Sequence, residues 1–355
     1  MKGEFKRMKR RLALPVMMLL LILAVVTLSS CGKKDQVVLN VYNWGDYIDE
    51  SVIPLFEKEY GIKVNYDTFS TNEDMYVKIK SGGGDYDVLF PSDYTIKRMI
   101  NEGMLAKLNM DNIPNYKYIA DRFRNLAYDP ENEYSVPYMW GTVGILYNTT
   151  MVKEPVTSWK ILWDQKYSKQ ILMLDSQRDS IGITLKMLGY SMNTRNPQEL
   201  QAAKEALIKQ KPLVLAYVGD DVKDKMIAGE AALAVVWSGD AVFMQWENED
   251  LAYVVPEEGS NLWFDAMVIP VTSKHQKEAE LFINFMCDPE IAFKNTDYIG
   301  YSTPHTEAYK MLDPELANDK TAYPDEADLV NCEVFEDLSN YMAEYDRIWT
   351  EVKAH

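Results

Sequence analysis

The chain has 355 residues, of which 47% are hydrophobic, and its formal net charge is −17. This acidic balance disfavours a nucleic-acid partner and favours cations. It contains three histidines, none of them spaced with another ligand type, which argues against a zinc site.

The first thirty residues carry the pattern of an export signal. Six basic residues precede an apolar run from Leu12 to Leu28, and the sequence Leu28-Ser29-Ser30-Cys31 follows. A charged start, an apolar stretch and small residues before a cleavage point define a secretory signal peptide. An uncleaved membrane anchor is the alternative, but the run is at the short end of the about 17 to 25 residues that a spanning helix needs. We therefore expect residues 1–30 to be a signal peptide.

The last residues of this segment resemble the bacterial lipobox, in which the cysteine becomes the lipidated first residue of the mature protein. The resemblance implies that Cys31 carries a lipid and that the protein is extracytoplasmic, anchored at the cell surface or in the periplasm. Residues 31–355 have 31 basic and 53 acidic side chains. Cys287 and Cys332 could form a disulfide or stay as free thiols, because the sequence does not give their separation.

Strand and helix patterns alternate along the next part of the chain. The predicted elements are strand 37–42, helix 51–60 ended by Gly61, strand 62–66, helix 73–81, strand 86–90 and helix 95–102. Three glycines at 82–84 form a loop before the third strand. Alternation of this kind favours parallel βαβ units with helices on both faces of a sheet.

Two long extended runs, 136–147 and 251–269, flank a second α/β region. That region includes a predicted helix at 201–210 and a strand at 231–237, and the chain ends with predicted helices at 277–286, 288–295 and 333–352. We interpret the runs as two crossover strands between two α/β lobes. Lobe 1 would comprise 37–142 plus 262–305, and lobe 2 would comprise 143–261 plus 306–355. A cleft between such lobes can close on a ligand by a hinge motion.

Four segments combine aromatic and acidic residues next to an apolar strand: 42–47, 91–94, 235–240 and 261–270. In the last of these, Trp263 and Asp265 are two residues apart and should share one face of the strand. Ligands of open α/β sheets bind at strand ends, and an indole surface beside a carboxylate suits an organic cation. The alternative is a core tryptophan and an aspartate that caps a turn. Four such segments favour one shared cation-binding cleft.

The strings at 42–47, 86–94, 135–141 and 299–304 resemble the spermidine/putrescine-binding proteins of bacterial ABC importers, and the similarity covers almost the whole mature chain. The resemblance implies a two-lobed periplasmic-binding-protein fold, type II-like, with a polyamine in the interlobe cleft and a membrane permease as partner. We also expect a monomer without metal or cofactor, and the lack of a nucleophile-elbow, zinc or phosphate-loop motif argues against an enzyme. The ligand-binding positions that it implies are Trp44, Asp46, Tyr47, Ser92, Tyr94, Asp179, Trp237, Asp240, Trp263, Asp265 and Tyr301.

This sequence departs from the family pattern at two positions. Spermidine-type members have an acid where this chain has Ser176 and a glutamate where it has Asp179, whereas Asp240 matches the acid of putrescine-type members. The preference between the two polyamines is left open.

Several of these residues also have a structural alternative. Asp46 and Asp93 could be helix N-caps, Asp179 could pair with Arg178, and Tyr301 could pack on Pro304. A sugar receptor would also use tryptophan stacking and aspartate hydrogen bonds, and a carboxylate-pair glycoside hydrolase is the rival of a different class. A chemosensory co-receptor without transport stays open as well. Trp140, Trp159 and Trp163 are assigned to packing.

Overall fold

The computed structural model describes residues 36–355, so the predicted signal peptide and Cys31 lie outside the described residues. The strands are β1 (Val38–Trp44), β2 (Lys63–Phe69), β3 (Val88–Leu89), β4 (Ser135–Asn148), β5 (Ile171–Leu174), β6 (Val214–Val218), β7 (Leu233–Trp237), β8 (Leu251–Val254) and β9 (Leu262–Val268). The helices are α2 (Val52–Tyr60), α3 (Asn72–Lys80), α4 (Asp93–Asn101), α5 (Gln177–Met187), α6 (Pro197–Gln210), α7 (Val222–Ile227), α8 (Ser238–Glu247), α9 (Gln276–Met286), α10 (Pro289–Ile299), α11 (Thr306–Met311), α12 (Pro314–Ala317) and α13 (Met342–Ala354).

The strands of this part of the chain form one sheet in the order β2-β1-β3-β9-β4-β7-β5-β6, with β8 also paired to β4. β1 is parallel to β2 and β3, and β5 is parallel to β6 and β7, which confirms the predicted βαβ units. The helix after β1 ends where expected, because Gly61 adopts a left-handed φ of 68°.

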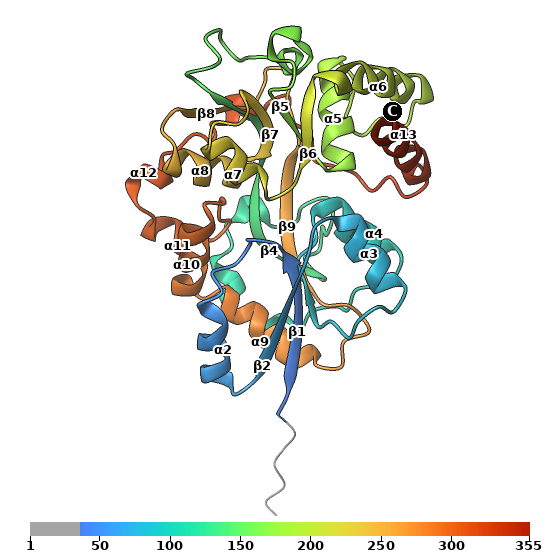
Figure 1. Ribbon diagram of the computed structural model, residues 1–355. Helices are drawn as coiled ribbons and strands as arrows, with labels where there is room; N and C mark the ends of the chain where they lie inside the picture. Colours follow the sequence, from blue (N-terminus) through green and yellow to red (C-terminus); the bar gives the residue numbers. More distant parts are fainter. Residues whose placement is uncertain (1–35) are drawn as a thin grey trace, which may run out of the picture. The chain divides into compact units, whose positions relative to one another are not determined.

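The predicted crossover at 136–147 is β4, which joins two groups of strands. Its residues Ser135–Thr142 pair with β9, and residues from Val143 onward pair with β7 and β8. Figure 1 shows β4 and β9 passing between the group around β1 and the group around β7. β4 therefore belongs to both groups.

The second extended run, predicted over 251–269, is two strands rather than one. β8 pairs with the second part of β4, β9 pairs with the first part, and residues 255–261 connect them. Gly259 has a φ of 85°, and a Cβ at this position would collide with the backbone of Asn331. Pro256 and the Gly259 turn break the strand, so the chain crosses between the groups through an irregular segment.

The predicted C-terminal helix at 333–352 begins later than expected, at Met342. The amide of Glu333 donates to the Ser260 carbonyl and its carbonyl accepts from Leu262, so this stretch is held in an extended form beside the 255–261 connection. α13 itself packs its buried face, which includes Tyr345 and Ile348, against α5 and α6. No helix among residues 36–355 combines the length and the apolar character that a bilayer crossing requires.

Candidate ligand-binding site

A cavity of about 440 Å³ lies where the ends of β1, β6, β7 and β9 meet the starts of α3, α4 and α5. The structure brings all eleven predicted ligand-binding residues to its wall. These are Trp44, Asp46, Tyr47, Ser92, Tyr94, Asp179, Trp237, Asp240, Trp263, Asp265 and Tyr301. Segments far apart in the sequence thus contribute to one site, although contact with a ligand stays a prediction for each residue.

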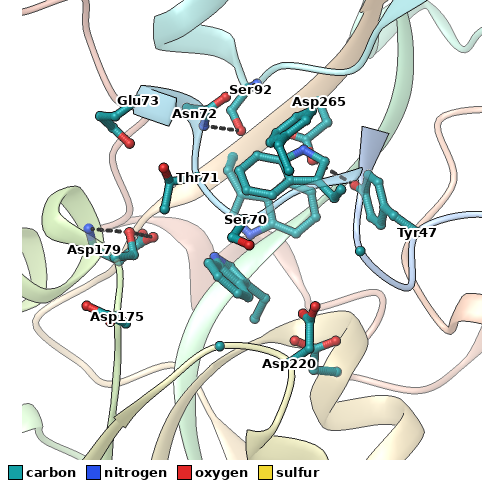
Figure 2. Close-up of a pocket in the computed structure, with 18 of the residues that line it drawn as sticks. Tyr47, Ser70, Thr71, Asn72, Glu73, Ser92, Asp175, Asp179, Asp220 and Asp265 are labelled. Atoms are coloured by element: carbon teal, nitrogen blue, oxygen red, sulfur yellow. Dashed lines mark hydrogen bonds between the residues drawn. The ribbon is translucent and has the colours of Figure 1, made fainter. Parts of the chain in front are cut away.

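The wall combines aromatic rings with an excess of carboxyl groups. Eight aromatic residues line it: Trp44, Tyr47, Phe69, Tyr94, Trp237, Trp263, Tyr301 and Phe335. Nine acids line it too, and within the described chain no Lys, Arg or His does: Asp46, Glu73, Asp74, Asp93, Asp175, Asp179, Asp220, Asp240 and Asp265. In Figure 2, Glu73 and Asp179 lie on the opposite side of the cavity from Asp265 and Tyr47, with Asp220 at a third place. The site therefore has carboxyl groups at separate positions around a group of apolar aromatic rings.

Asp265 is a buried acid of this wall. It is 5% exposed, and its Oδ2 accepts a 2.8 Å hydrogen bond from the hydroxyl of Tyr47. Its Oδ1 is buried and has no hydrogen-bond partner among the described residues. Burial raises the pKa of Asp265 to about 7. A buried acceptor without a partner is costly, which makes this atom ready to accept from a ligand donor.

Trp263 reaches the cavity from the same strand, as its two-residue spacing from Asp265 predicts. It is 4% exposed, and its indole lies 5.5 Å from the ring of Tyr301, centroid to centroid. Tyr301 in turn meets Tyr47 edge to face at 5.1 Å. Tyr301 therefore belongs to the wall of the site, as predicted, and the three rings enclose the Asp265 end.

Two glycines make room for these rings. A Cβ on Gly141 of β4 would lie 2.6 Å from the Trp263 indole, and a Cβ on Gly239 at the start of α8 would collide with the ring of Tyr301. The close approach of backbone and ring at both places excludes any side chain larger than hydrogen.

Asp179 is held at the other end by its own helix start. Ser176, the N-cap of α5, accepts from the Asp179 amide and donates a 2.7 Å hydrogen bond to Asp179 Oδ2. Asn261 Nδ2 donates to Asp179 Oδ1 at 3.1 Å, while Asn261 Oδ1 is buried without a partner in the described chain. The pairing of Asp179 with Arg178 is not observed, because Arg178 instead donates to the carbonyl of Glu336 and to Asn193. Burial raises the pKa of Asp179.

Ser92 and Tyr94 are tied to α3 by Asn72, whose Nδ2 donates to Ser92 Oγ at 3.0 Å and to the Tyr94 hydroxyl at 3.1 Å. The Tyr94 hydroxyl donates to Glu73 Oε1 at 3.1 Å. Burial raises the pKa of Glu73, although the Tyr94 hydrogen bond opposes this. Neither Asn72 nor Glu73 was predicted, because the preceding strand was expected to end at Tyr66, whereas β2 extends to Phe69 and so ends close to them.

The N-cap alternatives for Asp46 and Asp93 are both wrong. Asp46 lies in a turn with a φ of 42°, six residues before α2. Asp93 is the first residue of α4, where its Oδ2 accepts a 2.9 Å hydrogen bond from the amide of Phe264 and so fixes α4 against β9. Burial raises the pKa of Asp93 to about 8. Asp93 holds in place the strand that carries Trp263 and Asp265.

Asp46, Asp220 and Asp240 make up the third acidic place of the cavity, and Lys223 lies behind them. Lys223 Nζ lies 3.0 Å from Asp46 Oδ2 and 3.4 Å from Asp240 Oδ1. Asp46 follows β1 and Asp240 lies in the first turn of α8, so this ammonium connects the two groups of strands. Asp220, also in the wall, approaches Gly45 so closely that a Cβ there would lie 2.6 Å from its Oδ2.

Sequence reasoning missed several other wall residues. Asp220 follows β6 much as the predicted acids follow their strands, and Tyr217 precedes it by three residues as Trp237 precedes Asp240, so this signal could have found it. Tyr217 itself packs on Trp349 and does not line the cavity. Phe335 lies in the segment predicted to be helical, and it packs edge to face on Tyr94 at 5.8 Å. Trp140 and Trp159 are buried core residues, as assigned. Cys287 and Cys332 are free thiols.

Comparison with known proteins gives the following similarities. Residues 52–324 match the family described as bacterial extracellular solute-binding protein. The spermidine/putrescine-binding periplasmic protein of Salmonella typhimurium is 36% identical over 92% of this chain and 94% of its own length. A Listeria monocytogenes protein described as a spermidine/putrescine ABC transporter has a solved structure with a TM-score of 0.87 and 46% identity, covering 89% of this chain and 98% of that one. A lipoprotein of Treponema pallidum has a TM-score of 0.80 and 30% identity, over 89% and 99% of the two chains.

Proposed function

This chain belongs to the bacterial extracellular solute-binding proteins, and we propose that its central cavity captures a linear polyamine, putrescine or spermidine, for an ABC importer. The fold is the two-lobed α/β fold of that family, whose members are non-enzymatic transport components. The relatives named for spermidine and putrescine binding support the ligand class. The chemistry of the cavity supports it independently.

The observation that carries the proposal is the Asp265 carboxyl group. It is buried beside Trp263, its Oδ1 has no hydrogen-bond partner among residues 36–355, and it faces a cavity lined by acids and rings. An alkylammonium group has a pKa of about 10.4, so it enters the site charged. Its removal from water is costly unless acceptors and counter-charges replace the hydration shell. Asp265 Oδ1 provides both.

The aromatic wall suits the methylene chain between the ammonium groups. Trp44, Trp237 and Trp263 line the cavity and provide large apolar rings. Each indole can also attract an ammonium by a cation–π interaction of about 0.5 to 2 kcal/mol. The acids lie at separate positions around these rings, so each could pair with a different amine group along a flexible polyamine. We propose the eleven predicted wall residues as the ligand contacts on this basis.

A neutral sugar fits this cavity less well than a polyamine. Its hydroxyls could stack on tryptophan, but they would leave an excess of buried carboxylates without counter-charge. The named relatives are binding proteins, which leaves the glycoside hydrolase with less support than the polyamine receptor.

Calorimetric titration tests the proposal directly. The purified protein is titrated with putrescine, spermidine and a maltodextrin panel at constant pH and salt. Saturable heat from at least one polyamine and none from the maltodextrins is expected. Saturable heat from a maltodextrin, with none from either polyamine, would contradict the proposal and favour the sugar receptor.

We propose in addition that the lobes are residues 37–142 plus 262–305 and residues 143–261 plus 306–355, and that they close around the ligand. The switch of β4 pairing between Thr142 and Val143 supports this boundary. A closed form would present surfaces of both lobes to the permease. Small-angle scattering should show a smaller radius of gyration with ligand and a monomeric mass with or without it.

The lipid anchor at Cys31 is also a proposal. The signal-peptide pattern of residues 1–30 and the similarity to a Treponema lipoprotein support it. In bacteria that express the full chain, the wild-type protein should partition into the detergent phase of a Triton X-114 extract. Cys31→Ala should move it to the aqueous phase, and an unchanged distribution would remove Cys31 as the lipidated residue.

A further inference from the structure

Among residues 36–355, one ammonium group, that of Lys223, pairs with the acids of the third place of the cavity. Lys223, on α7, has a side chain that is only 14% exposed, and it contacts Asp46 Oδ2 at 3.0 Å and Asp240 Oδ1 at 3.4 Å. It does not line the cavity, whereas both acids do. Burial lowers the pKa of Lys223, but the carboxylates of Asp240, Asp46 and Asp220 more than offset this, so the group stays charged.

The two partner acids differ in what they could do without Lys223. Asp240 is 6% exposed on its side chain, so its charge needs a partner inside the protein or in the ligand. Asp46 is 69% exposed and can be neutralised by solvent ions. An amine of a ligand at this end would therefore compete with Lys223 mainly for Asp240. It would also meet repulsion from an ammonium already fixed there.

Among the described residues, no Lys, Arg or His makes an ion pair with Asp265 or Asp179, although the charge of the buried Arg178 partly offsets the burial that raises the pKa of Asp179. Asp265 accepts from Tyr47 and has Ser92 beside it, and Asp179 accepts from Ser176 and Asn261. Both places also keep a buried oxygen without a partner in the described chain, Asp265 Oδ1 and Asn261 Oδ1. Within the described chain these two places therefore have no ion-paired ammonium group, whereas the third already has one.

We propose that Lys223 is a specificity-determining residue, which acts through Asp240 as a built-in counter-ion and biases the cavity toward diamines over triamines. This inference rests on the proposed polyamine function. It assigns Lys223 a positioning role, since the side chain stands behind the acids rather than in contact with ligand. Removing its charge should open the third place to a further amine.

The test compares wild type with Lys223→Met, Lys223→Arg and Lys225→Met by calorimetry with putrescine and spermidine. Lys225 is the matched control, because it lies two residues away on α7, pairs with Asp221 and is absent from the cavity wall. We expect Lys223→Met to raise the ratio of the putrescine Kd to the spermidine Kd by about tenfold, because the vacated acids attract the third amine. Lys223→Arg and Lys225→Met should leave the ratio within about twofold of wild type.

The outcomes separate the two proposals. If wild type binds neither polyamine, the proposed function fails. If both bind and Lys223→Met leaves the ratio unchanged, or weakens both equally, Lys223 only fastens the two loops together and the specificity role is overturned. Should Lys223→Met fail to fold in thermal melts, Lys223→Gln is measured in its place, with the same ratio deciding the result.

Discussion

The hydroxyl of Tyr47 donates a 2.8 Å hydrogen bond to Oδ2 of Asp265, across 218 residues of sequence. The bond joins the loop after β1 to β9 and uses only one carboxylate oxygen. The other, Oδ1, is left buried and unpartnered among the described residues. Tyr47 thereby orients the carboxyl group and leaves one oxygen for a ligand donor.

Asp265→Asn should weaken diamine binding by about tenfold or more, because it removes a buried counter-charge worth on the order of 2 kcal/mol. The amide keeps the shape of the side chain, so the fold should be retained. Calorimetry with putrescine measures the change. Asp346→Asn is the control, since Asp346 is exposed on α13 and outside the cavity. Equal affinities for wild type and Asp265→Asn would exclude Asp265 from the site.

Trp263→Ala should also weaken binding by about tenfold, through loss of apolar contact and of the cation–π attraction. Trp246→Ala is the matched control, because Trp246 is 48% exposed on α8 and does not line the cavity. Intrinsic tryptophan fluorescence during a putrescine titration gives a second readout. If both variants bind like wild type, the Trp263 indole does not contact the ligand.

Diamine affinity should fall as the pH drops below about 7. Burial raises the pKa of Asp265 to about 7, so at lower pH a proton occupies the group that a ligand ammonium needs. Putrescine keeps both charges over this range because its amines titrate near pH 10, so the protein causes the change. We expect Kd to rise by about tenfold or more from pH 7.5 to pH 5.5. In Asp265→Asn this dependence should be shallower, and an equal slope would assign the effect to other groups such as Asp93.

The same pKa shift has a consequence for the ligand-free protein. The folded state holds the Asp265 proton more tightly than the unfolded chain, so this group's contribution to stability falls as pH rises from about 4 to about 7. Asp265→Asn removes the cost of a buried charge. At pH 8 the ligand-free variant should therefore be more stable than wild type, on the order of 1 kcal/mol. Urea unfolding at pH 5 and pH 8 measures the difference, which should shrink at the lower pH. A variant less stable than wild type at pH 8 would contradict the assignment of a costly buried charge.

Much of the site could be predicted because the apolar pattern of the sequence indicates where strands end. Trp263 and Asp265 share a strand at a spacing of two, and strand geometry alone places them on one face. The Trp44 and Asp240 segments likewise follow apolar strands. The family resemblance then identified further wall residues, such as Tyr301, that the hydrophobic pattern alone does not indicate.

Contacts made through loops could not be predicted in the same way. Lys223 stands on a six-residue helix whose position depends on how β6 and β7 are placed, so nothing local indicates its partners Asp46 and Asp240. Helix propensity at 333–341 is overridden by backbone pairing of Glu333 with the 255–261 connection. That pairing depends on the Gly259 turn and is invisible in either segment alone.

Gly239→Ala should weaken polyamine binding although it adds only a methyl group outside the ligand's reach. The new Cβ would collide with the Tyr301 ring, which packs against both Tyr47 and Trp263. Because Gly239 lies in the first turn of α8 next to Asp240, its backbone cannot retreat without moving Asp240 as well. The ring must then leave the cavity wall, and we expect a loss of affinity of about tenfold.

A double-mutant cycle with Tyr301→Ala tests this cause. If the methyl acts through the Tyr301 ring, Gly239→Ala should cost little further affinity once the ring is gone, and the two losses will be strongly non-additive. Additive losses would mean that the methyl disturbs α8 and Asp240 directly. Thermal melts of both single variants and of the double variant separate a loss of stability from the loss of binding.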